Sequence, residues 1–239
     1  MVVKAAAAIS QTLSGAAGLD LRAYRPQHVK TRVRQALERE GVTTIADLTR
    51  LLASDADARR RFRASIAVSV TGLFREPAQF DLLEQKLLPP LLANGRRITV
   101  WSAGCADGTE LYSVAIVLHR LGALGRAHLL GSDLLEENLA EARRGTYASV
   151  TIAPELRVRC RWELRDLTRD GAPRGAWRLV ICRNLAIYLA PDARDALHTT
   201  LAGALAPGGV LLLGHTERLT HAEALGLEHV APHAYRRSA

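Results

Sequence analysis

The sequence lacks the features that mark disulfide-linked, metal-binding and membrane-spanning proteins. Its three cysteines are an odd number without a C-x-x-C pair, which argues against a disulfide framework and against a zinc site. No stretch of about eighteen apolar residues runs without a charge, so we expect no membrane insertion. The opening residues have no leucine-rich segment of the length that a secretory signal needs. These absences favour a cytoplasmic protein with no bound metal.

Aromatic residues and lysines are also scarce. Aromatic side chains make up 5% of the 239 residues, which leaves few for stacking on bases and makes nucleic acid an unlikely partner. The net charge is +8, and of the 32 basic residues only Lys4, Lys30 and Lys86 are lysines. Such an excess suits nucleic acid, a membrane surface or an acidic protein. Codon bias toward arginine explains part of it equally well.

The hydrophobic periodicity changes near residue 95 and divides the chain into two predicted domains. In the first part Val29, Val33 and Leu37 recur at four-residue spacing before Gly41, as in a helix with a C-cap glycine. Further helices are predicted over 44–52, 56–68 and 77–87, and Pro89 and Pro90, followed by Asn94-Gly95, mark the end of the last one. Residues 1–88 are therefore predicted to form a helical N-terminal domain, and residues 89–239 a second domain.

From Ile98 onward, short apolar runs alternate with helical patterns, which is typical of βαβ units around a buried parallel sheet. Strands are predicted over 98–103, 128–133, 177–182 and 209–214, helices over 109–121, 135–143 and 192–205, and an antiparallel edge strand over 229–235. The predicted fold class is α/β, with a small all-α domain in front.

Ligands of an open parallel sheet bind beyond the carboxyl ends of its strands, so the residues that follow each strand are candidates for a site. The first strand is followed by a loop with Gly104 and Gly108, which has neither the Lys-Ser/Thr of a P-loop nor the G-x-G-x-x-G spacing. This loop is equally well explained as a tight turn. Asp133, after the second strand, suits the two hydroxyls of a ribose or the N-cap of a helix.

Five runs in order carry a specific resemblance. They are VTGLFREPAQF, VWSAGCADGTELYS, GSDLLEENLAEARRGTY, ICRNLAIYL and LAPGGVLLLGHTERL. They resemble the successive motifs of the chemotaxis-receptor glutamate methyltransferases, the CheR family, over roughly residues 17 to 220. The resemblance implies a Rossmann-like class I methyltransferase sheet that binds S-adenosylmethionine, preceded by a small all-α N-terminal domain.

The resemblance also implies site residues. Arg75 and Tyr188 match catalytic positions; without the resemblance, a surface ion pair and a packed helix residue would explain them as well. The positions that match cofactor-binding residues are Ser69, Thr71, Arg75, Gly104, Glu110, Asp133, Asp166, Leu167, Arg183 and Asn184. A glutamate acceptor is already ionised at neutral pH, so the transfer needs alignment and exclusion of water rather than a base.

The match departs from the family in several places, among them the D-I-D run, which is Asp133-Leu134-Leu135 here, and Asp166, which replaces an asparagine. The family run G-E-E-P-Y-S is Gly108–Ser113 here, with the sequence GTELYS, and Gln79 stands where a histidine is usual. Between Tyr147 and Asp166 the family has a small β-subdomain of about twice this length, with which some members hold a receptor's carboxyl-terminal tether. This chain has room for one hairpin there, so we expect no tether peptide to be required.

Three functional hypotheses follow. The first is a protein-glutamate O-methyltransferase that acts on an acidic helical chemoreceptor-like segment, which meets a basic helix face with Lys30, Arg32 and Arg34. The alternative is that this helix face, like most charged helix faces, is exposed to solvent and binds no partner. The second hypothesis is a methyltransferase with another acceptor, such as a small molecule or nucleic acid. The third is a non-catalytic S-adenosylmethionine-binding regulatory module, against which the retained Arg75 and Tyr188 argue.

Overall fold

The computed structural model describes residues 11–93 and 95–238. The chain divides into two compact units. The first runs up to Ser69 and includes Tyr188–Ala196, and the second comprises Val70–Ile187 and the chain from Leu197 onward. Within the described residues no helix is long and apolar enough to cross a membrane, and no group of three His, Cys, Asp or Glu residues is arranged to hold a metal ion.

The first unit contains the predicted helices. They are α2 (Pro26–Glu40), α3 (Ile45–Ser54) and α4 (Ala56–Ala67). Proline begins α2 and Gly41 ends it in the left-handed conformation with φ 66°, which glycine adopts without strain. The hydroxyl of Thr44 accepts a hydrogen bond from the Asp47 amide and so caps the start of α3.

The segment Tyr188–Ala196 joins this unit through backbone hydrogen bonds. The amide of Arg25 donates to the carbonyl of Tyr188 at 2.9 Å, and the amide of Ala190 donates to the carbonyl of Ala23 at 2.8 Å. The ring of Tyr188 lies 4.9 Å from the ring of His28, centroid to centroid. The polypeptide therefore returns to the helical unit immediately after the CRN run.

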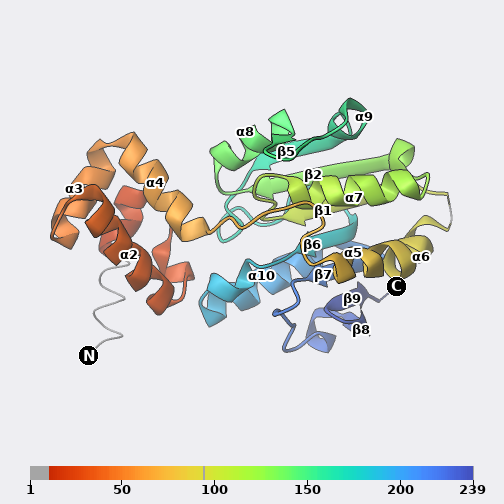
Figure 1. The fold of residues 1–239 in the computed structure, drawn as a ribbon. Helices are drawn as coiled ribbons and strands as arrows, with labels where there is room; N and C mark the ends of the chain where they lie inside the picture. The colour runs from red at the N-terminus through yellow and green to blue at the C-terminus, as the bar shows by residue number, and fades with distance from the viewer. Residues whose placement is uncertain (1–10, 94, 239) are drawn as a thin grey trace. The chain divides into compact units, whose positions relative to one another are not determined.

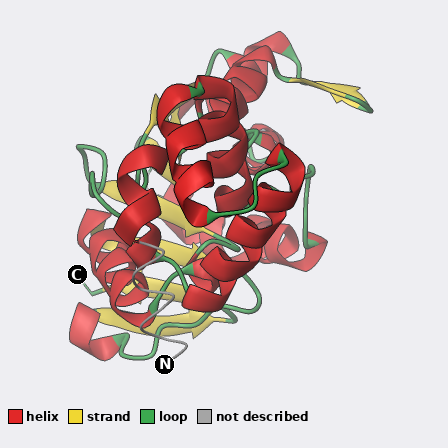
Figure 2. Ribbon diagram, turned by 90° about the vertical axis from the view of Figure 1, so that its left-hand side faces the viewer, coloured by secondary structure: helices red, strands yellow, loops and turns green. Residues whose placement is uncertain are grey.

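The second unit is built on a seven-stranded sheet with the order β5-β2-β1-β6-β7-β9-β8, seen as one layer of strands in Figures 1 and 2. Its strands are β1 (Ile98–Ala103), β2 (Ala127–Asp133), β5 (Cys160–Leu164), β6 (Trp177–Cys182), β7 (Leu205–Leu213), β8 (Leu227–Ala231) and β9 (Ala234–Arg237). The strands from β5 to β7 are parallel, and β9 and β8 continue the sheet antiparallel. The α/β class and the four predicted parallel strands are confirmed.

Two strand predictions need correction. The edge strand β5 was not predicted, because its exposed Arg161 and half-buried Glu163 interrupt the apolar run that marked the other parallel strands. The expected single strand over 229–235 is two strands, β8 and β9, joined by a turn in which His233 has φ 59°. Pro232 precedes it and has no amide hydrogen to give to a ladder, so the strand breaks there.

The helices of this unit are α5 (Pro77–Leu82), α6 (Leu88–Leu92), α7 (Thr109–Arg120), α8 (Glu136–Arg144), α9 (Pro154–Arg157) and α10 (Pro191–Ala204), whose first residues belong to the first unit. A π-helical turn, η2 (Leu83–Leu87), joins α5 to α6. The prediction that Pro89 and Pro90 end this helical segment was wrong. Both stand in the first turn of α6, where a missing amide hydrogen costs no intrahelical bond.

One hydrophobic core explains why α5 and α6 belong to the second unit. Phe80, Leu88 and Leu91 pack in the same buried cluster as Val114 of α7 and Val100 of β1. A fully buried side chain of this size contributes about 1.5–3 kcal/mol. The boundary between the units therefore falls after Ser69, whereas the sequence analysis placed the domain boundary at residue 88.

The segment from Thr146 to Asp166 holds one small hairpin, which is as many as its length allows. The hairpin pairs β3 (Thr146–Tyr147) with β4 (Val150–Thr151). The remaining residues form α9 and then β5, which pairs with β2 in the main sheet. Within this segment no separate β-subdomain forms.

Candidate functional site

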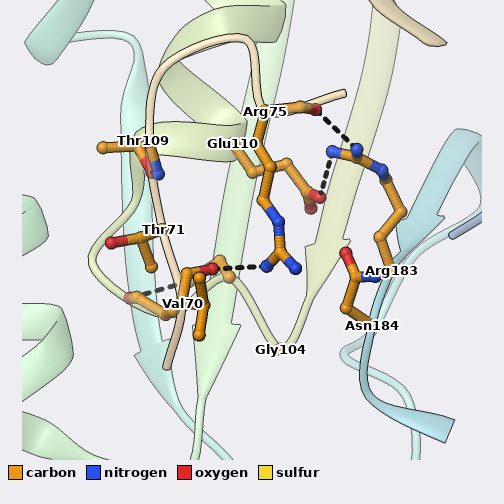
Figure 3. A pocket seen from close by; sticks show the side chains of 11 residues that line it. Val70, Thr71, Arg75, Gly104, Thr109, Glu110, Arg183 and Asn184 are labelled. Carbon is orange, nitrogen blue, oxygen red and sulfur yellow. Dashed lines mark hydrogen bonds and ion pairs between the residues drawn. The ribbon is translucent and has the colours of Figure 1, made fainter. Parts of the chain in front are cut away.

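A pocket opens where β1 and β6 end, and three segments that are distant in sequence line it (Figure 3). They are the segment before α5, the loop between β1 and α7 together with the first turn of α7, and the two residues after β6. The lining residues are Val70, Thr71, Gly72, Arg75, Gly104, Cys105, Ala106, Thr109, Glu110, Arg183 and Asn184. The pocket thus lies at the edge of the sheet where the sequence predicts a ligand.

The loop after β1 needs its two glycines for space and for conformation. Gly104 has φ 77° and Gly108 has φ 86°, both in the left-handed region. A Cβ atom at Gly104 would collide with the side chain of Leu185, and one at Gly108 would lie 2.6 Å from the ring of Trp162. The amide of Gly104 donates to the carbonyl of Ser132 at 2.8 Å. The loop is therefore held against β2 with its backbone facing the pocket.

Asp133 lies behind this loop rather than in the pocket lining. One oxygen of its buried carboxylate accepts the Ala106 amide at 2.9 Å, and the other accepts the Leu135 amide at 3.0 Å and the Asn138 side chain at 2.9 Å. Burial raises the pKa of Asp133, and these hydrogen bonds oppose that rise. The N-cap position of α8 is Leu135, so Asp133 shapes the turn before the helix and fixes the loop that lines the pocket.

The segment before α5 is fastened to the first turns of α7. The amide of Gly72 donates to the hydroxyl of Thr109 at 3.2 Å, and the amide of Phe74 donates to the hydroxyl of Ser113 at 2.8 Å. Phe74 has φ 54° and Glu76 has φ 62°, an uncommon conformation for residues other than glycine. Such strain costs about 1–3 kcal/mol per residue and persists only where surrounding contacts hold it.

The side chain of Arg75 points into the pocket (Figure 3). Its guanidinium donates one hydrogen bond, from Nη1 to the carbonyl of Val70 at 2.5 Å. That bond crosses the segment from one end to the other. Since a guanidinium has five N–H donors, this cation keeps donors for a carboxylate ligand.

Arg183 is the opposite case, because its buried guanidinium is engaged on all three nitrogens. Nε donates to Gln79 Oε1 at 2.5 Å and Nη1 to Glu110 Oε2 at 3.1 Å. Nη2 donates to the carbonyl of Arg75 at 2.6 Å and to Glu76 Oε2 at 2.9 Å. With its side chain only 3% exposed, Arg183 ties the three lining segments together.

The two carboxylates bound to Arg183 have pKa values that are shifted in opposite directions. Burial raises the pKa of Glu110, against the pull of Arg183 and of the Ser102 hydroxyl, which donates to Glu110 Oε1 at 2.7 Å. Burial also acts to raise the pKa of Glu76, but Arg183 and His215 outweigh it and hold that pKa below its usual value. Nδ1 of His215 lies 2.8 Å from Glu76 Oε1.

Glu217 fixes the turn that follows β6. One oxygen of this buried carboxylate accepts the amides of Asn184 at 2.8 Å and Gly214 at 2.9 Å, and the other accepts those of Leu185 at 3.1 Å and Ala186 at 2.8 Å. Asn184 has φ 59°, so the clamp holds a left-handed residue in the pocket lining. Glu217 lies in the run LAPGGVLLLGHTERL of the sequence analysis, which gave it no role.

Comparison with known protein families identifies both parts of the chain. The model of the CheR methyltransferase SAM-binding domain matches residues 69–153 and 148–231, and that of the CheR methyltransferase all-alpha domain matches residues 5–67. The chain belongs to the CheR methyltransferase family. It is an S-adenosylmethionine-dependent methyltransferase of CheR type, with a class I methyltransferase sheet and an all-α N-terminal part.

Similar proteins are found in several bacteria. The chemotaxis protein methyltransferase of Listeria innocua is 29% identical over 232 residues, which cover 88% of each chain. Chemotaxis protein methyltransferase 1 of Pseudomonas aeruginosa is 25% identical over 236 residues, covering 85% of this chain and 86% of that protein. Chemotaxis protein methyltransferase 1 of Vibrio cholerae is 27% identical over 238 residues, covering 87% of this chain and 86% of that protein.

The residues that the CheR resemblance singles out fall into three groups. The pocket brings together Thr71, Arg75, Gly104, Glu110, Arg183 and Asn184. Asp133, Asp166 and Leu167 lie in the same unit outside the lining; Asp166 accepts the amide and the hydroxyl of Thr168 in the loop after β5. Ser69 and Tyr188 belong to the first unit. The individual roles of all these residues stay predictions.

Proposed function

We propose that this CheR-type enzyme transfers the methyl group of S-adenosylmethionine to a glutamate side chain of a chemoreceptor. The observation that carries the proposal is the meeting of three CheR-like runs in one pocket, joined by the buried Arg183. The names of the three bacterial relatives described above, each a chemotaxis protein methyltransferase, support the acceptor class.

The residues in and around the pocket fit the chemistry of the cofactor. Arg75 has donors left for the cofactor's carboxylate, and Glu110 offers an anion to its ammonium group or its ribose. The glycine loop, with no side chain at Gly104, lets backbone approach a ligand closely. In this proposal Asp166 and Leu167 hold the adenine. Asp133 acts indirectly, by fixing the amide of Ala106 in the loop. Polar contacts to the cofactor come from Ser69, Thr71 and Asn184.

The reaction asks little acid–base chemistry of the protein. When bound, S-adenosylmethionine supplies an electrophilic methyl group on a sulfonium. A glutamate carboxylate is ionised at neutral pH and attacks without a general base. The protein's task is to align the attacking oxygen and exclude water, for which we propose Tyr188 as the orienting group and Arg75 as a second contact.

For the acceptor we propose an acidic helical segment that meets α2. Lys30 and Arg34 are exposed, lie one turn apart, and form no ion pair among the described residues. Arg32 does not share their face: it is half-buried and donates to Gln35. The proposed basic face is therefore narrower than the sequence analysis expected. The single hairpin at 146–151 supports recognition without a tether peptide.

We place the reaction in the cytoplasm, where chemoreceptor methylation segments and a reducing environment are found together. The three cysteines, Cys105, Cys160 and Cys182, are buried and unpaired. Burial raises the pKa of each thiol, which leaves them protonated and unreactive at neutral pH.

The proposal is tested with methyl-labelled S-adenosylmethionine and the purified cytoplasmic domain of a bacterial chemoreceptor. The expected product is a labelled receptor that releases its label as methanol in mild base, because carboxyl esters hydrolyse there and N-methyl groups do not. Arg75→Ala serves as the matched inactive enzyme. Base-stable label, or label on RNA or a small molecule instead, would refute the glutamate acceptor while leaving the methyltransferase assignment in place.

A further inference from the structure

The loop after β7 places an exposed histidine next to the pocket's ion-pair network. His215 has a side chain that is 59% exposed, and its Nδ1 lies 2.8 Å from Glu76 Oε1. The same carboxylate accepts from Arg183 through Oε2 at 2.9 Å, and Oε1 accepts from the side-chain Nδ2 of Asn184 at 3.4 Å. Arg183 and Asn184 line the pocket, so His215 is connected to the pocket lining through one residue, Glu76.

The carboxylate fixes which ring nitrogen of His215 is available. Arg183 holds Glu76 in its ionised form, and a carboxylate only accepts hydrogen bonds, so Nδ1 of His215 carries a hydrogen and donates it. Nε2 then remains as the outward nitrogen, and in the described residues no group donates to it or accepts from it. A carboxylate–imidazole pair of this kind orients the ring.

We propose that His215 binds the acceptor glutamate, donating a hydrogen bond from Nε2 to the carboxylate oxygen that does not attack. This inference rests on the proposed function, since it needs a carboxylate acceptor. The attacking oxygen forms a bond to the methyl carbon, the carbon–sulfur bond breaks, and its electron pair stays on sulfur, so no proton is transferred. Both ring nitrogens donate in this arrangement, so the proposal takes His215 as an imidazolium, whose charge Glu76 balances beside a cationic cofactor.

The other interpretation is that His215 only holds Glu76 in place, and one substitution separates the two. In His215→Asn the side-chain amide nitrogen takes the position of Nδ1 and keeps the bond to Glu76, while the outward nitrogen is lost. In His215→Ala both are lost. His221→Asn, an exposed histidine of the same unit, is the matched control.

The measurements are kcat and KM for the chemoreceptor cytoplasmic domain and, by calorimetry, Kd for S-adenosylhomocysteine. We expect His215→Asn and His215→Ala to raise the acceptor KM equally, by roughly ten- to a hundredfold, which is the size of one hydrogen bond to a charged group. The cofactor Kd of His215→Asn and the kinetics of the control should stay within about twofold of the parent.

Two results would overturn the inference. An acceptor KM unchanged in His215→Asn but raised in His215→Ala would leave His215 only the task of holding Glu76. A weakened cofactor Kd in His215→Asn would place its action on the cofactor pocket. Failure of the proposed function is recognised separately, because the parent enzyme would then give no base-labile receptor product.

Discussion

Glu217 offers the sharpest test of how the pocket is held. Its two carboxylate oxygens each accept two backbone amides, and the side chain is buried with an exposed fraction of 4%. Glutamine has the same shape but one acceptor oxygen, so Glu217→Gln leaves two amides facing an NH2 group. A buried donor without an acceptor costs about 1–3 kcal/mol, so we expect the free energy of unfolding to fall by roughly 2–4 kcal/mol.

Unfolding in urea, followed by tryptophan fluorescence, reports on the right part of the molecule. All three tryptophans, Trp101, Trp162 and Trp177, lie in the second unit together with Glu217. The control is Glu223→Gln, an exposed glutamate of the same unit, which should change the free energy by less than about 0.5 kcal/mol. If Glu217→Gln is as stable as this control, the four hydrogen bonds do not hold the turn and the argument is wrong.

Four other predictions follow from the geometry. Gly104→Ala puts a methyl group against a neighbouring leucine in a left-handed conformation, so calorimetry should show cofactor binding weakened by about tenfold or more, and parental affinity would contradict the close approach. Tyr188→Phe should lower kcat with the fold and cofactor Kd intact; an unchanged kcat would remove Tyr188 from the reacting centre. Reversing Lys30 and Arg34 to glutamate should slow receptor methylation most at low salt, whereas a loss that does not depend on salt would exclude steering. The pKa of Glu76 is held low in the folded state, so its ion pairs stabilise the fold above its unfolded pKa near 4.3, and this stabilisation is lost as pH falls through the folded pKa. In Glu76→Gln the free energy of unfolding should therefore fall less steeply below about pH 5. An equal slope in the variant and the parent would contradict the ion pairs.

The sequence predicts the interior of the sheet well because burial on both faces leaves a simple pattern. The run 98–103 and the run 177–182 are almost wholly apolar, and both match observed strands at each end. The edge strand β5 has no such pattern, since only one side of it pairs with a neighbour and its charged side chains reach water. Pattern-based prediction therefore succeeded in the middle of the sheet and failed at its margins.

The helix around Pro89 and Pro90 was mispredicted for a different reason. A proline interrupts an α-helix when its missing amide hydrogen and its ring disturb the preceding turn. Here the π-helical turn over Leu83–Leu87 comes directly before, and the prolines occupy the first turn of the next helix. Burial of Leu88, Leu91 and Leu92 in the core then stabilises a helix that local propensity disfavours.

The pocket lining could be predicted because the topology of a parallel sheet brings the strand ends together. Gly104, Glu110 and Arg183 follow the ends of β1 and β6 and meet as expected, whereas Thr71 follows no strand and was indicated by the CheR resemblance alone. The residues that hold these segments could not be predicted in the same way. Glu217 is 33 positions from the Asn184 amide that it accepts, and no local pattern records such a pairing.

Arg183 shows what a motif match does and does not determine. The resemblance places this arginine among cofactor contacts, yet its three nitrogens bind Gln79, Glu110, Glu76 and the carbonyl of Arg75. A buried cation that loses its partners costs several kcal/mol, so these bonds are what permits an arginine there at all. A motif thus identifies a position that the site requires, whereas the hydrogen bonds decide how it acts. For Arg183 they favour a role in positioning Glu110 and the backbone of Arg75, two of the residues that we propose contact the cofactor.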